Sequence, residues 1–236
     1  MKLMYDFHIH SCLSPCGDMD MTPGNIVNMA KLMGYDAIAL TDHNTSGNCE
    51  SAMYFGKQAG LTVIPGMELC TQEEVHIVCL FPTLENAMDF SDYVYSTLPP
   101  VKNKADIFGE QAFCDKADEI SGYEEKLLIT ASSIGTGKVK KTVEQYGGIC
   151  YPAHIDRPSF SIISNLGIID ESFGFSFAEI FDREKTAELK EKFPVLKKMK
   201  IISDSDAHYL DKLRPENSFI EVSENTAKGI LDFFKE

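Results

Sequence analysis

The chain of 236 residues has a formal net charge of −14, with 22 basic and 36 acidic side chains. Generic binding of a polyanion is therefore disfavoured, because nucleic-acid affinity depends on clustered basic residues. We expect no duplex nucleic acid as partner, while a short nucleotide is still allowed. No run approaches about 18 apolar residues, which excludes a transmembrane helix, and no membrane partner is expected. The first residues, Met1 to Phe7, lack the basic and apolar regions of a signal peptide, so a cytoplasmic location is expected.

Seven short segments rich in β-branched and aromatic residues predict strands. In chain order they are Leu3–His8, Ala37–Thr41, Thr62–Leu69, Val75–Phe81, Gly148–Ala153, Phe177–Phe181 and Lys200–Ser203. Amphipathic helices are expected between them. The first has Thr22 as N-cap before Pro23 and ends near Gly34, and the last follows Asn225. This alternation predicts an α/β protein with a parallel sheet, closed or nearly closed into a barrel.

Residues 98–137 depart from this alternation. Phe108–Cys114 and Glu125–Thr130, on either side of Asp115–Tyr123, predict a β-hairpin ahead of a helix that carries Val139. We interpret this stretch as an insertion over the barrel rim that acts as a lid or an oligomer contact. Because the chain has no internal repeat and no low-complexity tract, it is expected to form a single domain over residues 1–236. The oligomeric state cannot be predicted from these patterns.

The seven cysteines are odd in number and form no C-x-x-C pair. We therefore expect buried reduced thiols and not a disulfide framework. Cys12 and Cys16 flank the first histidine motif and could bind zinc or iron as soft thiolates, although the structural interpretation is favoured.

All six histidines fall at or near the ends of predicted strands. They are His8 and His10 in D-F-H-I-H-S, His43 in T-D-H-N, His76 in V-H-I-V, His154 in P-A-H-I-D-R and His208 in S-D-A-H, and Glu68 ends the third strand. In a β/α barrel the C-terminal ends of the strands meet at one mouth. Imidazoles and carboxylates together are the ligands of zinc, manganese or iron. Each motif alone has an ordinary structural explanation, whereas one metal centre accounts for all of them.

These motifs, in this order, resemble those of the PHP family, named for its polymerase and histidinol-phosphatase members. The resemblance is carried by H-I-H-S at 8–11, T-D-H-N at 41–44, His154, D-A-H at 206–208, Glu68 and His76. It extends from the first strand to about residue 210. It implies a distorted seven-stranded β/α (TIM-like) barrel with two or three divalent metal ions (Zn, Mn or Fe).

The resemblance also implies three metal positions. The first would be held by His8, His10, Glu68 and Asp206, the second by Glu68, His76 and His154, and the third by His43, His208 and an acidic residue from the loop after the first strand. That loop is longer than in the family pattern, and we expect Asp18 rather than Asp20 to be the acidic ligand. Asp42 either orients a ligand or caps the following helix. Asp204 is expected to lie near the site.

The predicted function is that of a metal-dependent phosphoesterase that hydrolyses a phosphomonoester or phosphodiester of a small metabolite or short nucleotide. Arg157 either grips the phosphate or forms an ion pair with Asp156 or Asp182, and His208 or a water molecule delivers the proton. Arg183 is a weaker candidate for the phosphate. The alternatives are an amidohydrolase-like enzyme that cleaves C–N bonds, a 5'-3' exonuclease acting on oligonucleotide ends, and a metal-binding module without catalysis.

Overall fold

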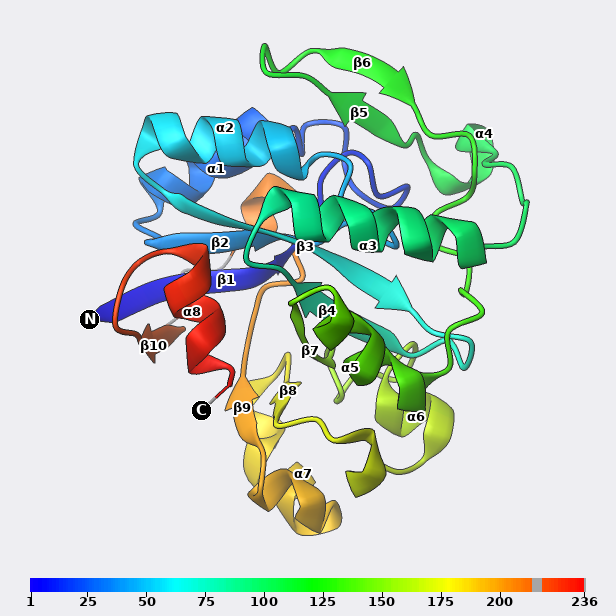
Figure 1. The fold of residues 1–236 in the computed structure, drawn as a ribbon, viewed down its shortest axis with the longest axis vertical. Helices are drawn as coiled ribbons and strands as arrows, with labels where there is room; N and C mark the ends of the chain where they lie inside the picture. Colours follow the sequence, from blue (N-terminus) through cyan, green and yellow to red (C-terminus); the bar gives the residue numbers. More distant parts are fainter. Residues whose placement is uncertain (214–217, 236) are drawn as a thin grey trace.

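The computed structural model describes residues 1–213 and 218–235. Six of the described strands form one curled sheet in the order β10-β1-β2-β3-β4-β7, and four others form two separate pairs, one of them a hairpin in the insertion (Figure 1). The sheet contains β1 (Lys2–Ile9), β2 (Ala37–Leu40), β3 (Thr62–Cys70), β4 (His76–Leu80), β7 (Ile149–Pro152) and β10 (Phe219–Glu221), and the other separate pair is β8 (Phe177–Glu179) with β9 (Lys200–Ile202). All seven predicted strands are present. The short strand β10, antiparallel to β1, was not predicted.

Helices cover the sheet as the sequence periodicity predicts. They are α1 (Pro23–Leu32), α2 (Cys49–Ala59), α3 (Leu84–Thr97), α5 (Thr136–Gln145), α6 (Ile162–Leu166), α7 (Thr186–Lys192) and α8 (Ala227–Phe233), with short 3-10 turns at Glu171–Phe173, Arg183–Lys185, Pro194–Lys197 and Leu210–Lys212. Thr22 caps α1 by accepting a hydrogen bond from the backbone N–H of Asn25, as predicted. Gly34 follows this helix with φ of 89°, a conformation that glycine adopts without strain.

The sheet is not all parallel, and the prediction of a parallel sheet is wrong for β4. This strand runs antiparallel to both β3 and β7. Only residues 71–75 connect β3 to β4, which is too short for the crossover that parallel strands require. The Thr71 N–H donates to the Val75 carbonyl at 2.9 Å and closes this turn. As a result, His76 at the start of β4 lies opposite Cys70 at the end of β3.

The strands form a curled half-barrel and not the continuous seven-stranded barrel that was predicted. Among the described residues, β8 and β9 pair with each other but share no ladder with the six-stranded sheet. Single hydrogen bonds bridge the gaps, from the Ile155 N–H to the Glu179 carbonyl (2.9 Å) and from the His10 N–H to the Ala207 carbonyl (3.0 Å). With three residues each, β8 and β9 are too short to extend ladders on both sides.

The insertion contains α4 (Ala105–Phe108) and a hairpin of β5 (Ala112–Cys114) and β6 (Ile120–Tyr123). The predicted second strand at Glu125–Thr130 was placed too late. Asp115 closes the turn earlier, because its carboxylate accepts hydrogen bonds from the N–H groups of Ala117 and Glu119. In Figure 1 the hairpin lies beside the helical layer of α1 and α2. The Asp118 carboxylate fastens it there by accepting hydrogen bonds from the Thr22 hydroxyl (2.6 Å) and the Gly24 N–H (2.8 Å).

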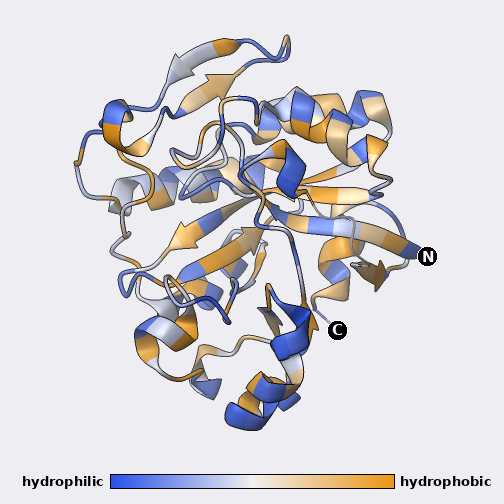
Figure 2. Cartoon of the chain, turned by 180° about the vertical axis from the view of Figure 1, so that it is seen from behind, coloured by the Kyte–Doolittle hydropathy of each residue, from blue (hydrophilic) through white to orange (hydrophobic). Residues whose placement is uncertain are grey.

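Apolar residues dominate the strands, and polar residues gather on the loops and on the outer faces of the helices (Figure 2). All seven cysteines are free, and five of them are buried. In the parts of the chain that the structure describes, every helix is too short or too polar to cross a membrane. Against this apolar background the buried polar residues stand out, and they gather where β1, β2 and β3 end.

Candidate metal centre

The six imidazoles lie together at one edge of the sheet, although they are spread from residue 8 to residue 208. Neighbouring ring centroids are 5.2 Å apart for His8 and His10, 4.5 Å for His10 and His43, 4.1 Å for His10 and His208, 5.2 Å for His43 and His76, and 5.4 Å for His76 and His154. His76 joins the cluster from the first residue of β4, since the antiparallel pairing brings that end of the strand to the same edge.

The Glu68 carboxylate lies at the centre of this cluster and is almost completely buried. Its Oε1 is 3.2 Å from His8 Nε2, 2.9 Å from His76 Nδ1 and 3.0 Å from His154 Nε2, and its Oε2 is 3.4 Å from His10 Nε2 and 2.9 Å from His43 Nδ1. Burial alone would raise the pKa of Glu68, but the surrounding imidazoles hold it well below its usual range. The carboxylate is therefore ionised and shared among five rings.

Several of these donor atoms converge on one another, and two of them lack a hydrogen-bond partner. His8 Nε2 and His10 Nε2 are 3.2 Å apart, and Asp206 Oδ1 is 3.4 and 3.3 Å from them. Asp206 Oδ1 and His43 Nδ1 are buried and have no hydrogen-bond partner of acceptable geometry, even though a Glu68 oxygen lies 2.9 Å from the latter. A tetrahedral site with bonds of about 2.1 Å places its donors about 3.4 Å apart.

The residues present thus fit divalent metal ions. Three groups have donor atoms close enough to share an ion, namely His8, His10 and Glu68, then His43, Glu68 and His76, and finally His10, His43 and His208. Asp206 adjoins the first group and His154 lies against the shared carboxylate. Apart from Asp18, the expected ligands are therefore assembled in one place.

Asp18 does not reach this cluster. Its carboxylate accepts a hydrogen bond from the Asp20 N–H at 2.8 Å, and its own N–H donates to the His208 carbonyl at 2.9 Å. Cys16 lies on this side of the loop instead and lines the same cavity as His43 and His208. Desolvation opposes ionisation of this thiol, but the two imidazoles lower the pKa of Cys16 to about 6. The extra residues of the loop thus bring a thiol, not a carboxylate, to the third group.

Glu179 holds His8 from behind the cluster and was missed by sequence reasoning. Its Oε2 is 2.8 Å from His8 Nδ1, and both side chains are fully buried. A proton on Nδ1 directed at this carboxylate leaves the Nε2 lone pair of His8 facing Glu68. The carboxylates around His8 raise its pKa well above the usual range, although burial opposes this. The available signal was a single acid within the apolar strand F-A-E-I-F.

Asp42 orients His10 through the loop that follows β1. It accepts hydrogen bonds from the N–H of Ser11 and the hydroxyl of Ser14, each at 2.7 Å. The Ser14 hydroxyl is in turn 2.9 Å from His10 Nδ1. The following helix α2 has Asn48 at its N-cap position, so of the two interpretations of Asp42 the structure supports the orienting one.

A cavity of about 260 Å³ opens in front of the cluster. It is lined by Cys16, His43, Glu68, His76, Ile129, His154, Arg157, Ser159, Phe160, Asp206 and His208. Arg157 is the one Lys or Arg among these lining residues. Its Nη2 is 3.0 Å from Asp206 Oδ2, and its guanidinium lies 4.2 Å from the ring centre of Phe181. The ion pair therefore forms with Asp206, whereas Asp156 is paired with Lys185 at 3.6 Å.

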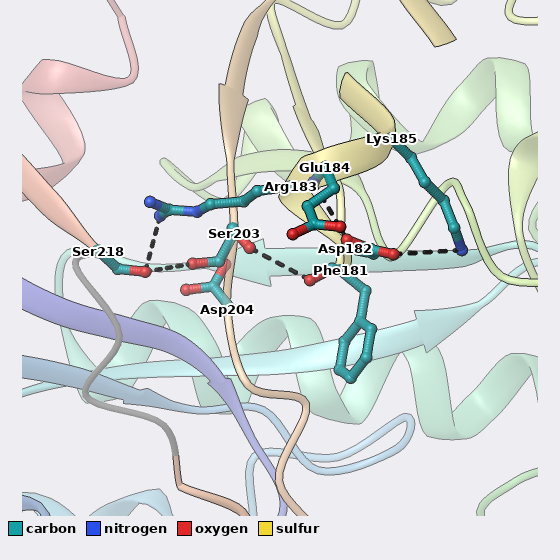
Figure 3. Close-up of a pocket in the computed structure, with 8 residues that line it drawn as sticks. All are labelled: Phe181, Asp182, Arg183, Glu184, Lys185, Ser203, Asp204 and Ser218. Atoms are coloured by element: carbon teal, nitrogen blue, oxygen red, sulfur yellow. Dashed lines mark hydrogen bonds and ion pairs between the residues drawn. The ribbon is translucent and has the colours of Figure 1, made fainter. Parts of the chain in front are cut away.

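A larger cavity of about 430 Å³ is lined in part by Phe181, and the lining described for it includes no histidine (Figure 3). Here Arg183 Nη2 donates to the Ser218 hydroxyl at 2.8 Å. Asp204 also faces this cavity, with its Oδ1 accepting from the Phe7 N–H. Arg183 and Asp204 thus do not line the cavity of the metal cluster, and we place the chemistry in the smaller cavity.

Backbone strain also concentrates around the smaller cavity. Of the six described non-glycine residues with positive φ, three line it, namely His154 (27°), Phe160 (53°) and Asp206 (48°), and a fourth, Asn44 (53°), follows His43 in the chain. Left-handed backbone conformations of such residues cost about 1–3 kcal/mol each and gather at functional sites.

Comparison with known proteins agrees with the family resemblance of the sequence motifs. The PHP domain model matches residues 6–225. A 5'-3' exoribonuclease of Haemophilus influenzae is 35% identical over 83 residues, a segment that covers 34% of this chain and 29% of that protein. The endonuclease Q of Pyrococcus furiosus has a similar fold over the whole chain, with a TM-score of 0.71 at 19% identity. This chain spans 56% of its length.

One expectation is corrected by these comparisons. The net charge of −14 led us to expect no duplex nucleic acid as partner. A second structure of endonuclease Q, with a TM-score of 0.70 and 18% identity, is a complex with a 27-mer duplex substrate carrying an abasic lesion at the active site. The match covers 100% of this chain and 57% of the endonuclease Q chain. That neighbour binds a duplex, so the fold does not exclude one, and net charge alone does not decide because a metal site captures a phosphate locally. From the matched family model and the assembled donor groups, we conclude that the chain belongs to the PHP domain family of metal-dependent hydrolases.

Proposed function

We propose that this hydrolase is a phosphoesterase that cleaves the phosphoester of a terminal nucleotide in a nucleic-acid chain. The observation that carries the proposal is a single guanidinium, Arg157, at the mouth of a cavity whose floor is Glu68 among five imidazoles. Divalent metal ions and a planar guanidinium both bind phosphate oxygens, and a site that offers the two together suits a phosphoester. The exoribonuclease among the relatives supports the choice of nucleic acid.

Two or three ions of zinc, manganese or iron would be held by these residues. We assign His8, His10, Glu68 and Asp206 to one position, Glu68, His76 and His154 to a second, and His43, His208 and Cys16 to a third. When bound, such ions polarise the phosphoryl oxygens and bring the pKa of water near neutrality.

The chain itself supplies binding and proton transfer. Arg157 is partly exposed and can direct two parallel N–H bonds at non-bridging phosphate oxygens while it stays stacked on Phe181. His208 is the most exposed of the six imidazoles, and its Nδ1 lies 2.9 Å from the Asp206 carbonyl. We assign it, when it is not engaged with an ion, as the donor of a proton to the leaving oxygen.

The proposal is tested by supplying the purified protein with Mn²⁺, Zn²⁺ or Fe²⁺ and following 5'-labelled oligoribonucleotides and oligodeoxyribonucleotides, single-stranded and duplex. We expect stepwise release of mononucleotides that stops when a chelator is added. Hydrolysis of simple amides with release of ammonia, and no cleavage of any phosphoester, would instead support the amidohydrolase alternative. A metal-bound lysine would favour that alternative, but no lysine is among the described residues lining the cavity.

Glu179 is a positioning residue, and its substitution tests the orientation of His8. In Glu179→Gln the amide can no longer stabilise a proton on His8 Nδ1 as strongly, so the ring is less firmly held with Nε2 toward Glu68. We expect metal affinity to fall by about 10- to 100-fold, as for other residues that orient metal ligands. Competition with a chromophoric chelator measures this directly. Unchanged affinity would show that Glu179 only fills the core.

Cys16 can be tested by spectroscopy without any substrate. If its thiolate joins His43 and His208 on an ion, replacing the native metal with Co²⁺ should give an intense near-ultraviolet thiolate-to-cobalt absorption. The band should disappear in Cys16→Ser and persist in Cys12→Ser, which is the matched control because Cys12 is buried against Cys114. The same spectrum in wild type and Cys16→Ser would return the third position to an oxygen or nitrogen ligand.

A further inference from the structure

Phe160 forms part of the wall of the metal-centre cavity and has no part in the chemistry described above. Its ring stacks on His76, with centroids 4.8 Å apart and planes inclined by 21°. Despite this contact Phe160 is 43% exposed. A large apolar side chain is thus fixed by one neighbour and still presents much of its surface at the cavity that holds the donor groups.

The backbone at this position makes the side chain more unusual. Phe160 has φ of 53°, in the region that favours glycine and is strained for a bulky residue. Its carbonyl accepts a hydrogen bond from the His76 N–H at 2.9 Å, which fixes the loop at the start of β4. Glycine would make the same backbone bond without strain, so this bond does not account for an aromatic side chain here. The ring is also only partly buried, so core packing gives an incomplete reason for it.

The composition of the cavity wall indicates what the ring would contact. His154, Arg157, Ser159 and Phe160 reach the cavity from one short segment, so the guanidinium and the ring lie three residues apart. Ile129, from the insertion, adds a second apolar side chain. A phosphate drawn to Arg157 and the donor groups would therefore leave the organic part of the substrate next to Phe160 and Ile129. The organic part that matches an exposed aromatic ring is a planar one.

We propose that Phe160 is a stacking platform for the nucleobase of the nucleotide whose phosphoester is cleaved. This inference rests on the proposed function and names how the substrate is recognised. Every base has a π-face, so stacking holds a nucleotide in place with little preference among bases. The segment 154–160 would then hold phosphate and base together, with the base contacting the ring and not a set of hydrogen-bonding groups.

The test compares two substrates that differ only in the base. One is a short labelled oligonucleotide, and the other carries a tetrahydrofuran abasic unit at the terminal position. Phe160→Leu keeps an apolar side chain at the same positive φ but removes the π-face. For the substrate with a base we expect kcat/KM to fall about tenfold, mainly through KM, and for the abasic substrate to change less than about twofold. Phe160→Tyr should retain the wild-type ratio of the two substrates.

Phe219→Leu is the matched control, because Phe219 is 42% exposed but lies on β10 opposite Met4, at the other end of β1 from His10. It should leave both substrates unaffected. Equal losses for the two substrates in Phe160→Leu would overturn the stacking role while leaving the phosphoesterase intact. If wild type cleaves neither substrate, the proposed function itself fails. Equilibrium dialysis gives a second measurement that does not depend on turnover. In it, Phe160→Leu should weaken binding of the product mononucleotide by about tenfold, as expected for kcat/KM.

Discussion

Glu68→Ala is expected to remove most of the bound metal and to lower kcat/KM by at least about 10³-fold. Glu68 contributes both oxygens to the cluster, at 2.9–3.4 Å from five imidazoles, and it is the carboxylate shared by two of the three candidate ligand groups. Without it, the second position would keep only the neutral imidazoles of His76 and His154, with no ligand charge to offset that of the ion. Metal content by elemental analysis and steady-state rates on a labelled oligonucleotide measure the two effects.

The control for this prediction is Glu73→Gln. Glu73 lies in the loop after β3 and accepts hydrogen bonds from the N–H and hydroxyl of Thr136, away from the metal cavity. It should keep full metal content and activity. Glu68→Gln preserves the shape of the side chain and should resemble Glu68→Ala in activity while folding like wild type by circular dichroism. Stoichiometric metal in both Glu68 variants would refute the shared-carboxylate arrangement.

Arg157→Ala is expected to lower kcat/KM by about 10²-fold without loss of metal. The guanidinium is the one Lys or Arg side chain among the described residues lining the cavity, and it is already oriented by Asp206 and by the face of Phe181. Its loss would remove two charge-assisted hydrogen bonds to phosphate. Arg157→Lys should recover only part of the rate, because an ammonium cannot form the bidentate contact.

Arg183→Ala serves as the matched control for Arg157. Arg183 faces the larger cavity of Figure 3, where it donates to Ser218, and is not part of the lining described for the metal cavity. We expect near-wild-type activity. If the Arg183 variant lost activity and the Arg157 variant did not, the substrate would have to occupy the larger cavity. Metal content should be unchanged in both variants, which separates substrate binding from ligand loss.

The sequence by itself determined the secondary-structure elements and the set of candidate metal ligands. Apolar runs located all seven predicted strands, and Thr22 before Pro23 located the start of α1, because these signals depend on neighbouring residues. The histidine motifs and Glu68 predicted the candidate metal ligands for the same reason. Each motif sits at a strand end, and strand ends are visible in the sequence.

Tertiary structure decided what depends on the path of the chain in space. The direction of β4 followed from a short turn, and it brought His76 to Glu68 from the start of a strand. The fold of the loop after β1, fixed by Asp42, brought Cys16 and not Asp18 to His43 and His208. The path of that loop depends on hydrogen bonds between residues far apart in the chain, such as the bond from the Ser11 N–H to Asp42, and local propensities contain no information about such bonds.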